Sequence, residues 1–205
     1  MEPPPEAPED LFSVVHRQRA CRAFAPRDVD DRSVERALEA ATFAPSAENR
    51  QPWGFVVVRD PGVRARIGDL TRRAWEGGGR SHSEGRLSAG LLAEVDAGAT
   101  GGIAAAPVIV VVCADTRLGD RRVLGPSIFP AVQNLLLAAT ALGLGSSLTT
   151  LPLVFGPELA ELLALPEEVV PMAAVPLGWP ARPLAPPRRL PVRDKAYRDR
   201  FGAPW

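Results

Sequence analysis

The sequence predicts an α+β fold in which a small sheet is flanked by helices. Three or four β-rich runs alternate with segments of helical periodicity, and Pro107–Cys113 is a continuous β-branched run. Such a run is typical of a strand that is buried on both faces. The 205 residues suit one domain, which at this length buries about 70% of its unfolded surface. We expect that domain over residues 10–205, after a proline-rich, disordered leader at residues 1–9.

Capping residues and apolar spacing predict the first two helices. Asp10 is placed to cap a helix that begins at Leu11. Asp30 or Asp31 begins the second helix, and its apolar residues recur at i, i+3, i+4 and i+7. These residues are Val34, Ala37, Leu38 and Ala41. We expect a strand at Phe55–Arg59 to follow after a polar connector.

Residues 61–102 form a glycine-rich segment with weak helical patterns. Its glycines include the run Gly77–Gly79, Gly85, Gly90 and the pair Gly101–Gly102. We expect two helices separated by a flexible break, and we interpret the segment as a mobile lid.

A helix predicted at Ser127–Leu142 is apolar almost all round, with Gln133 and Asn134 as its main polar residues. Such a helix has no face for water, so either a monomer core or a second subunit buries it. The tail from Pro180 to Trp205 is too proline-rich to pack alone, and we expect it to lie over its own domain or a neighbour. The other predicted elements are a strand at Ser146–Thr149, a helix at Pro157–Leu163 and a strand at Val169–Leu177.

Composition restricts the possible partners. The formal net charge is zero, which argues against nucleic acid as the main partner. Cys21 and Cys113 form no disulfide framework, and we find neither a signal peptide nor an apolar span of about 18 residues. We therefore expect a cytoplasmic protein with no membrane partner. His16 and His82 lie far apart in the sequence, so we expect no metal site.

The connector Pro45–Trp53 carries more chemistry than a turn requires. It holds two prolines, the amides Asn49 and Gln51, the hydroxyl of Ser46 and an indole. Prolines fix backbone angles, and amides offer paired donors and acceptors. The pattern favours a segment that holds a planar polar partner, while the alternative is a capped turn whose amides are satisfied internally.

The connector also resembles the APS-x-x-N-x-QPW signature of the nitroreductase family, FMN-dependent oxidoreductases that work as homodimers. Three other regions are similar to family motifs and follow in family order over roughly residues 11–202. They are the opening R-x-x-R-x-F at Arg19–Phe24, the central helix at Gln133–Ala139 with Leu142–Gly145, and the tail at Pro176–Pro180 with Arg188–Pro191. The resemblance implies a nitroreductase-like fold with a mostly antiparallel sheet, and a C-terminal tail that extends onto the partner subunit.

The resemblance implies a phosphate site built from both ends of the chain. It assigns Arg19 and Arg189 to the FMN phosphate, with Arg188 as the alternate, because guanidinium groups bind phosphate through paired, charge-assisted hydrogen bonds. Arg22 matches a basic position that the family directs at the pyrimidine edge of the flavin, where a cation stabilises the anionic reduced form.

Ala20 belongs to the same cofactor-binding motif, although this chain departs from the family there. Many members have arginine and serine where this chain has Gln18 and Ala20. One phosphate or ribityl contact is therefore missing or made by the backbone. Arg72 or Arg73 is a candidate substitute for a family residue that meets the pyrimidine end.

Two further segments are assigned to the cofactor by the resemblance. The connector would contact the flavin bound mainly by the other subunit, through Pro45, Ser46, Ala47, Asn49 and Gln51. The backbone of Leu148, Thr149 and Thr150 would lie along the flavin and donate an N–H group toward N5. The site would then lie at the interface of a homodimer.

The resemblance implies an FMN-dependent oxidoreductase that uses NAD(P)H to reduce nitroaromatics, quinones or related acceptors in a ping-pong sequence. We expect no catalytic side chain, because the flavin carries the electronic chemistry. The 61–102 segment would shape the acceptor pocket, with Trp75 or His82 in its lining. The alternatives are a specialised flavoenzyme of the family, such as a dehalogenase or a natural-product oxidase or dehydrogenase, and a non-catalytic flavin-binding dimer.

Overall fold

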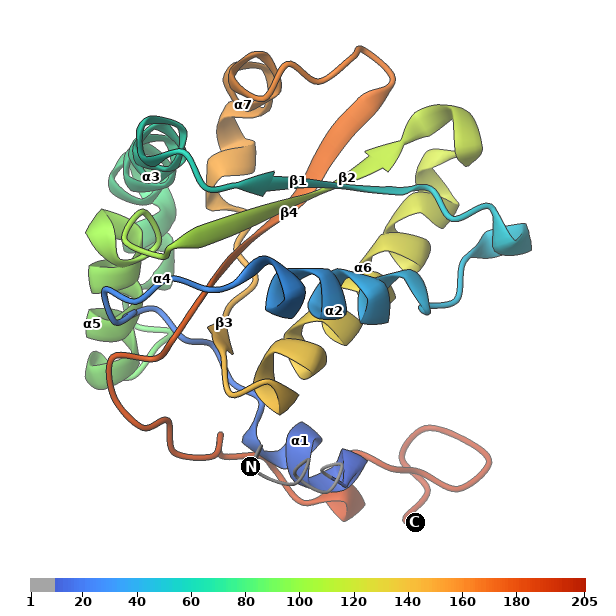
Figure 1. The fold of residues 1–205 in the computed structure, drawn as a ribbon. Helices are drawn as coiled ribbons and strands as arrows, with labels where there is room; N and C mark the ends of the chain where they lie inside the picture. The colour runs from blue at the N-terminus through green and yellow to red at the C-terminus, as the bar shows by residue number, and fades with distance from the viewer. Residues whose placement is uncertain (1–9) are drawn as a thin grey trace, which may run out of the picture.

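The computed structural model describes residues 10–205, apart from the side chain of Arg121, so the predicted leader at residues 1–9 lies outside the described residues. A four-stranded sheet with the order β1-β2-β4-β3 forms its centre, and all neighbouring strands are antiparallel (Figure 1). The strands are β1 (Trp53–Val58), β2 (Val108–Asp115), β3 (Gly145–Ser146) and β4 (Val169–Gly178). The predicted α+β class with a mostly antiparallel sheet is confirmed.

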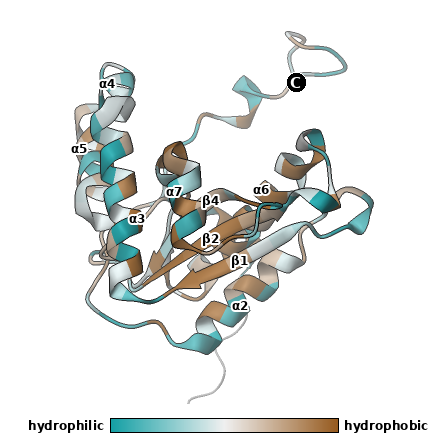
Figure 2. Cartoon of the chain, turned by 90° about the horizontal axis from the view of Figure 1, so that it is seen from above, coloured by the Kyte–Doolittle hydropathy of each residue, from teal (hydrophilic) through white to brown (hydrophobic). Residues whose placement is uncertain are grey.

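Helices cover both faces of this sheet. They are α1 (Leu11–Arg17), α2 (Asp31–Thr42), α3 (Pro61–Ala74), α4 (Arg80–Ser83), α5 (Ala89–Ala97), α6 (Arg121–Ala141) and α7 (Gly156–Leu162). The α2 helix begins as predicted, because the Asp30 side chain accepts a hydrogen bond from the Ser33 amide at 2.8 Å. Figure 2 shows the central strands as hydrophobic and the outer faces of the surrounding helices as more polar.

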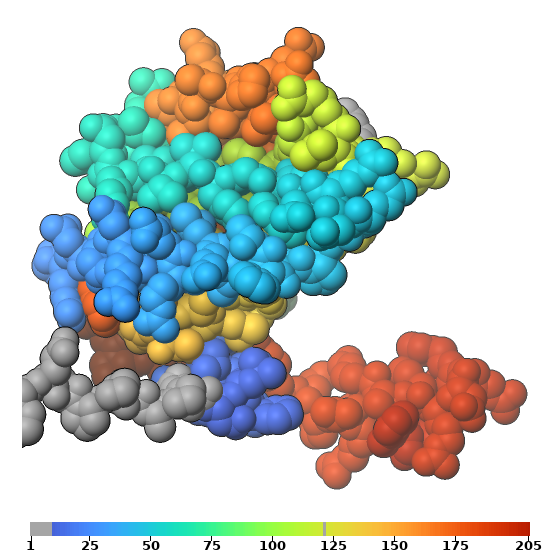
Figure 3. Space-filling view, turned by 45° about the vertical axis from the view of Figure 1, so that its right-hand side comes forward, coloured from blue at the N-terminus to red at the C-terminus, as the bar shows by residue number. Residues whose placement is uncertain are grey.

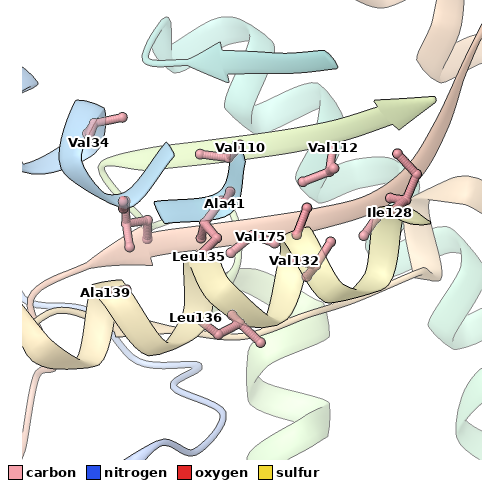
Figure 4. Close-up of a cluster of buried hydrophobic side chains, with 14 of the residues drawn as sticks. Val34, Ala41, Val110, Val112, Ile128, Val132, Leu135, Leu136, Ala139 and Val175 are labelled. Carbon is pink, nitrogen blue, oxygen red and sulfur yellow. The ribbon is translucent and has the colours of Figure 1, made fainter. Parts of the chain in front are cut away.

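The strand β2 is the centre of the core. Its side chains alternate between the two faces of the sheet, so Val110 and Val112 pack with α2 and α6 whereas Ile109 and Val111 pack with α3 and α7. All four side chains are fully buried. Figure 4 shows the first of these clusters, in which residues of α6 such as Leu135 meet the sheet. The sequence prediction of a strand buried on both faces is confirmed.

The long helix α6 begins six residues earlier than the predicted Ser127–Leu142. The Asp120 side chain caps it by accepting from the Arg122 amide at 2.8 Å, and Pro126 lies inside the helix. The expectation that the chain has no apolar span of about 18 residues was also wrong. By length and composition, Arg122–Ala141 would be long and apolar enough to cross a membrane. Packing against the sheet and α2 identifies α6 as a core helix in this fold.

The segment 61–102 folds as an interrupted helical excursion. A π-helical turn, Trp75–Gly79, joins α3 to α4, and a second one, Gly98–Gly102, follows α5. Trp75 is buried, and its Nε1 donates to Asp96 Oδ1 at 3.0 Å, which ties the end of α3 to α5. Trp75 therefore packs inside the excursion rather than in the predicted pocket lining.

The C-terminal tail has little regular structure beyond a short 3₁₀ turn at Val192–Asp194. Its last residues stand away from the rest of the chain (Figure 3). Apolar side chains there are largely exposed, among them Val192, Phe201 and Trp205. The end of the tail therefore does not lie over its own domain, which was one of the two expected positions.

Both thiols are expected to be unreactive in the folded protein. Cys21 and Cys113 are almost fully buried, and burial raises both pKa values, that of Cys113 to about 11 from an ordinary value of 9.0. A thiol-labelling reagent at pH 8 should therefore modify neither cysteine until denaturant is added.

The same pKa shift predicts how stability changes with pH. The unfolded Cys113 thiol ionises near 9 and the folded one near 11, so the free energy of unfolding should fall as the pH rises through this interval. Rapid labelling of native protein, or stability that rises between these pH values, would contradict this account of the core.

Candidate functional site

A cleft of about 750 Å³ lies where the segment after α1, the helix α5, the core helix α6, the turn after β3 and the tail meet. This volume is within the usual range for small-molecule sites. Its lining combines arginines from both ends of the chain with apolar side chains such as Leu136 and Leu148. The arginines are Arg19, Arg22, Arg188 and Arg189.

Backbone pairing brings the two ends of the chain together. The Cys21 amide donates to the Ser146 carbonyl at 2.8 Å, so the segment that carries Arg19 and Ala20 runs beside β3. Four residues later, the Ala25 amide donates to the Trp179 carbonyl at 2.8 Å, where the tail begins. The start of the tail and the opening motif are therefore held side by side.

Arg19 is fixed by two interactions. Its Nη1 donates to the Ala185 carbonyl of the tail at 3.1 Å, and its Nη2 pairs with Glu94 Oε2 of α5 at 3.3 Å. Arg188 and Arg189 are exposed at the edge of the cleft. The predicted phosphate ligands from the two chain ends thus share one cleft.

Arg22 is half-buried in the wall of the same cleft. Burial lowers the pKa of its guanidinium, and the nearby Glu94 carboxylate opposes that shift. An arginine remains a cation under such a shift. Among the described residues, no carboxylate lines this cleft, so its charge is positive and suits an anionic ligand.

The turn after β3 contributes polar and apolar surface. Ser147 and Leu148 line the cleft. The neighbouring Ser146 Oγ is buried and has no hydrogen-bond partner in the described part of the chain. A buried polar atom without a partner is costly, and it is a feature of sites whose partner is a ligand or water.

Thr149 and Thr150 follow this turn but do not line the cleft. The Thr149 amide donates to the Ala174 carbonyl at 2.9 Å, and its Oγ1 accepts from the Leu151 amide at 3.2 Å. The Thr149 N–H group is therefore committed to the sheet. An amide donated from this stretch to a ligand would have to come from Leu148 or Thr150.

The connector that carries Pro45, Ser46 and Ala47 lies away from this cleft in the fold (Figure 1). The Ala47 amide donates to Ser127 Oγ at 3.2 Å, near the start of α6. Leu136 lies in the cleft nine residues further along α6, which corresponds to roughly 13 Å of helix. Within one chain, the structure does not bring the connector to the arginines.

The connector is held partly by its own side chains. Ser46 Oγ accepts from the Gln51 amide at 3.0 Å, and Gln51 Nε2 donates to the Asn49 carbonyl at 3.4 Å. Glu48, Asn49 and Gln51 all have positive φ, between 51° and 53°. The connector therefore holds three residues other than glycine in the left-handed conformation. Such backbone strain is common at functional segments.

Sequence reasoning missed the contribution of α5 and of the π-helical turn Gly98–Gly102 that follows it. Glu94, Gly98 and Gly102 recur at every fourth position and face the opening motif. A Cβ atom at Gly98 would lie 2.8 Å from Arg22 Cδ, and one at Gly102 would lie 2.0 Å from the Arg22 carbonyl oxygen. The available signal in the sequence was this spacing, which places one carboxylate and two glycines on the same face of a helix. Glycines on one face indicate that another part of the chain packs closely there.

Other expected lining residues are engaged elsewhere. Arg72 pairs with Asp69 and Glu76, and Arg73 forms two hydrogen bonds to Glu158. His82 contacts Arg86 on the surface of the excursion. We therefore find no support for these residues as substitutes at the pyrimidine end or in the pocket lining.

Fold and site together define an α+β protein with a basic cleft built from both ends of its chain. The chain belongs to the nitroreductase family, whose family model matches residues 15–179. A protein provisionally named NADH dehydrogenase/NAD(P)H nitroreductase from Archaeoglobus fulgidus is 33% identical over 181 residues, which is 84% of this chain and 86% of that protein. The family resemblance of the sequence motifs is confirmed.

Two further likenesses concern deiodinases. An iodotyrosine deiodinase from Haliscomenobacter hydrossis is 29% identical over 199 residues, covering 91% of this chain and 86% of that protein. The solved structure of oxidized iodotyrosine deiodinase bound to FMN and 3-iodo-L-tyrosine has a TM-score of 0.75 and 24% identity, over 94% of this chain and 100% of that chain. The second likeness confirms the nitroreductase-like fold.

The close contact at Gly102 predicts a selective effect of alanine there. Gly102→Ala should displace the backbone at Arg22 and destabilise the protein by about 1–3 kcal/mol. Gly101→Ala is the matched control, because nothing lies within 4 Å of a Cβ atom at that position of the same turn. Urea unfolding of both variants measures the difference, and equal stabilities would contradict the packing described for the π-helical turn after α5.

Proposed function

We propose that the protein is an FMN-dependent oxidoreductase that uses NAD(P)H to reduce nitroaromatic, quinone or related electron acceptors. The observation that carries the proposal is the cleft in which arginines from both ends of the chain converge beside apolar side chains. Membership of the nitroreductase family and the FMN in the solved deiodinase support the choice of cofactor. When bound, FMN supplies the capacity to accept and release hydride.

The residues of the cleft suit the parts of this cofactor. Arg19 and Arg189 would hold the phosphate, because guanidinium groups match phosphate oxygens with charge-assisted hydrogen bonds. Leu136 and Leu148 would pack against the apolar part of the ring system. Arg22 would place a fixed positive charge near the ring, which favours a negatively charged reduced form.

We also propose a homodimer in which each site draws on both subunits. The support is that the connector with Asn49 and Gln51 lies away from the arginines of its own chain. An apolar groove between α1, α2 and α6 adds to this support, with the exposed Leu11 and Phe43 in its lining. The tail, whose end stands away from its own domain, would extend onto the partner.

A specialised reaction is the second candidate, and the deiodinase relative favours it. A reductive dehalogenase would use the same cofactor and the same arginines, so the cleft suits both reactions. The two candidates differ in the acceptor. Turnover of a nitroaromatic or quinone supports the general reductase, whereas turnover confined to a halogenated aromatic supports the dehalogenase.

The proposed reaction predicts a coloured protein and a defined kinetic pattern. Purified protein should carry flavin absorbance, and initial rates with NAD(P)H and a nitroaromatic should give parallel double-reciprocal lines. The parallel pattern follows because donor and acceptor would use one cleft in turn. Intersecting lines would contradict the shared cleft, and protein that remains colourless after incubation with FMN would contradict the choice of cofactor.

The proposed sharing of the site between subunits can be tested with hybrid dimers. Arg189→Gln and Gln51→Ala should each weaken FMN binding, the first by about ten- to hundredfold because a charge-assisted contact is lost. A hybrid of the two variants, purified through two different tags, should regain one intact site per dimer. The measurement is the flavin content of the hybrid beside that of each parent.

The hybrid distinguishes a site shared between subunits from a site formed by one chain, because the two substitutions fall in different sites or in the same site accordingly. If the arginines and the connector of one chain served the same site, every site in the hybrid would carry one defect and flavin would not return. Arg198→Gln is the matched control for the arginine change, since Arg198 lies in the tail outside the cleft lining.

A further inference from the structure

Glu94 lies between two arginines beside the cleft. Its Oε2 is 3.3 Å from Arg19 Nη2, and its Oε1 is 3.3 Å from Arg182 Nη2. The carboxylate also acts on Arg22, whose pKa it raises against the effect of burial. One negative charge on the lid helix α5 therefore faces three positive charges, two from the opening motif and one from the tail.

This carboxylate borders the larger cleft without lining it. Glu94 lines a neighbouring cleft of about 400 Å³, and both clefts share Arg19, Ala20, Arg22 and Ala185. An anion in the larger cleft and the Glu94 carboxylate would therefore both interact with the guanidinium group of Arg19. The side chains of Arg19 and Glu94 are 26% and 36% exposed, so solvent screens the pair only in part.

The helix that carries Glu94 is seated tightly. Gly98 and Gly102, in the π-helical turn that follows α5, lie so close to Arg22 that a Cβ atom on them would clash with its side chain and its carbonyl oxygen respectively. These close contacts fix the face of α5 against the opening motif and hold the carboxylate at Arg19. The pairing is therefore set by packing, unlike the exposed Glu84–Arg80 pair within the lid.

We propose that Glu94 is an internal counter-anion that competes with the cofactor phosphate for Arg19 and so sets the affinity of the phosphate site. The inference rests on the proposed function, which supplies the phosphate. Because coupling between two ligands is reciprocal, phosphate bound at Arg19 weakens the contact of Glu94 and the hold of α5. The strength with which α5 is held against the opening motif therefore depends on whether the phosphate site is occupied.

The test compares two flavins that differ only in the phosphate. Apo-protein is titrated with FMN and with riboflavin, and binding is followed by flavin fluorescence. Glu94→Gln removes the competing charge, so FMN should bind about two- to fivefold more tightly, as expected for a partly exposed ion pair. Riboflavin affinity should not change. Glu84→Gln, the matched control within the lid, should alter neither.

Two results would overturn the proposal. Weaker FMN binding by Glu94→Gln would mean that Glu94 orients Arg19 rather than competing for it. Equal changes for FMN and riboflavin would mean that the substitution acts on the general packing of the cleft. Either result leaves the proposed function intact.

Failure of the proposed function has a different signature, since wild-type protein would then bind neither flavin. In that case inorganic phosphate replaces FMN as the probe, with thermal stabilisation as the measurement. Glu94→Gln should then gain more stability from phosphate than wild type or Glu84→Gln. An equal gain in all three proteins would overturn the role of Glu94.

Discussion

The site depends on the pairing of the opening segment with β3 and with the start of the tail. Hydrogen bonds from Cys21 to Ser146 and from Ala25 to Trp179 join parts of the chain that are more than a hundred residues apart in sequence. Gly145 makes the first approach possible, because a Cβ atom there would lie 2.6 Å from Cys21 Sγ. Close packing therefore explains why a glycine stands at position 145. As a consequence of this pairing, the arginines from both ends of the chain lie in one cleft.

The parts of the fold that were predictable are those with local signals. The β-branched run of β2 and the capped, periodic α2 were found because burial on two faces and capping both leave a pattern in consecutive residues. The start of α6 was misplaced because Pro126 lies inside the helix, where it is usually unfavourable. Burial of α6 against the sheet and α2 offsets that cost, and this packing has no local signature.

The site was predictable only where family motifs existed. Arg19, Arg188 and Arg189 were identified from motifs at opposite ends of the chain, and the structure brings them to one cleft. Glu94 was missed because a carboxylate on a weakly periodic helix resembles ordinary surface charge. Its meaning depends on which residues α5 packs against, and that is a property of the tertiary structure.

The connector gives the strongest physical reason to look beyond one chain. Glu48, Asn49 and Gln51 adopt left-handed conformations that cost about 1 kcal/mol or more each, with asparagine the least unfavourable. The internal bonds of Ser46 and Gln51 hold this shape, yet the backbone could have turned with less strain through glycine. A strained, largely exposed segment rich in amides is suited to present polar groups to another molecule. In the proposed dimer that molecule would be the cofactor of the partner subunit, so the strain and the distance from the chain's own arginines have one common explanation.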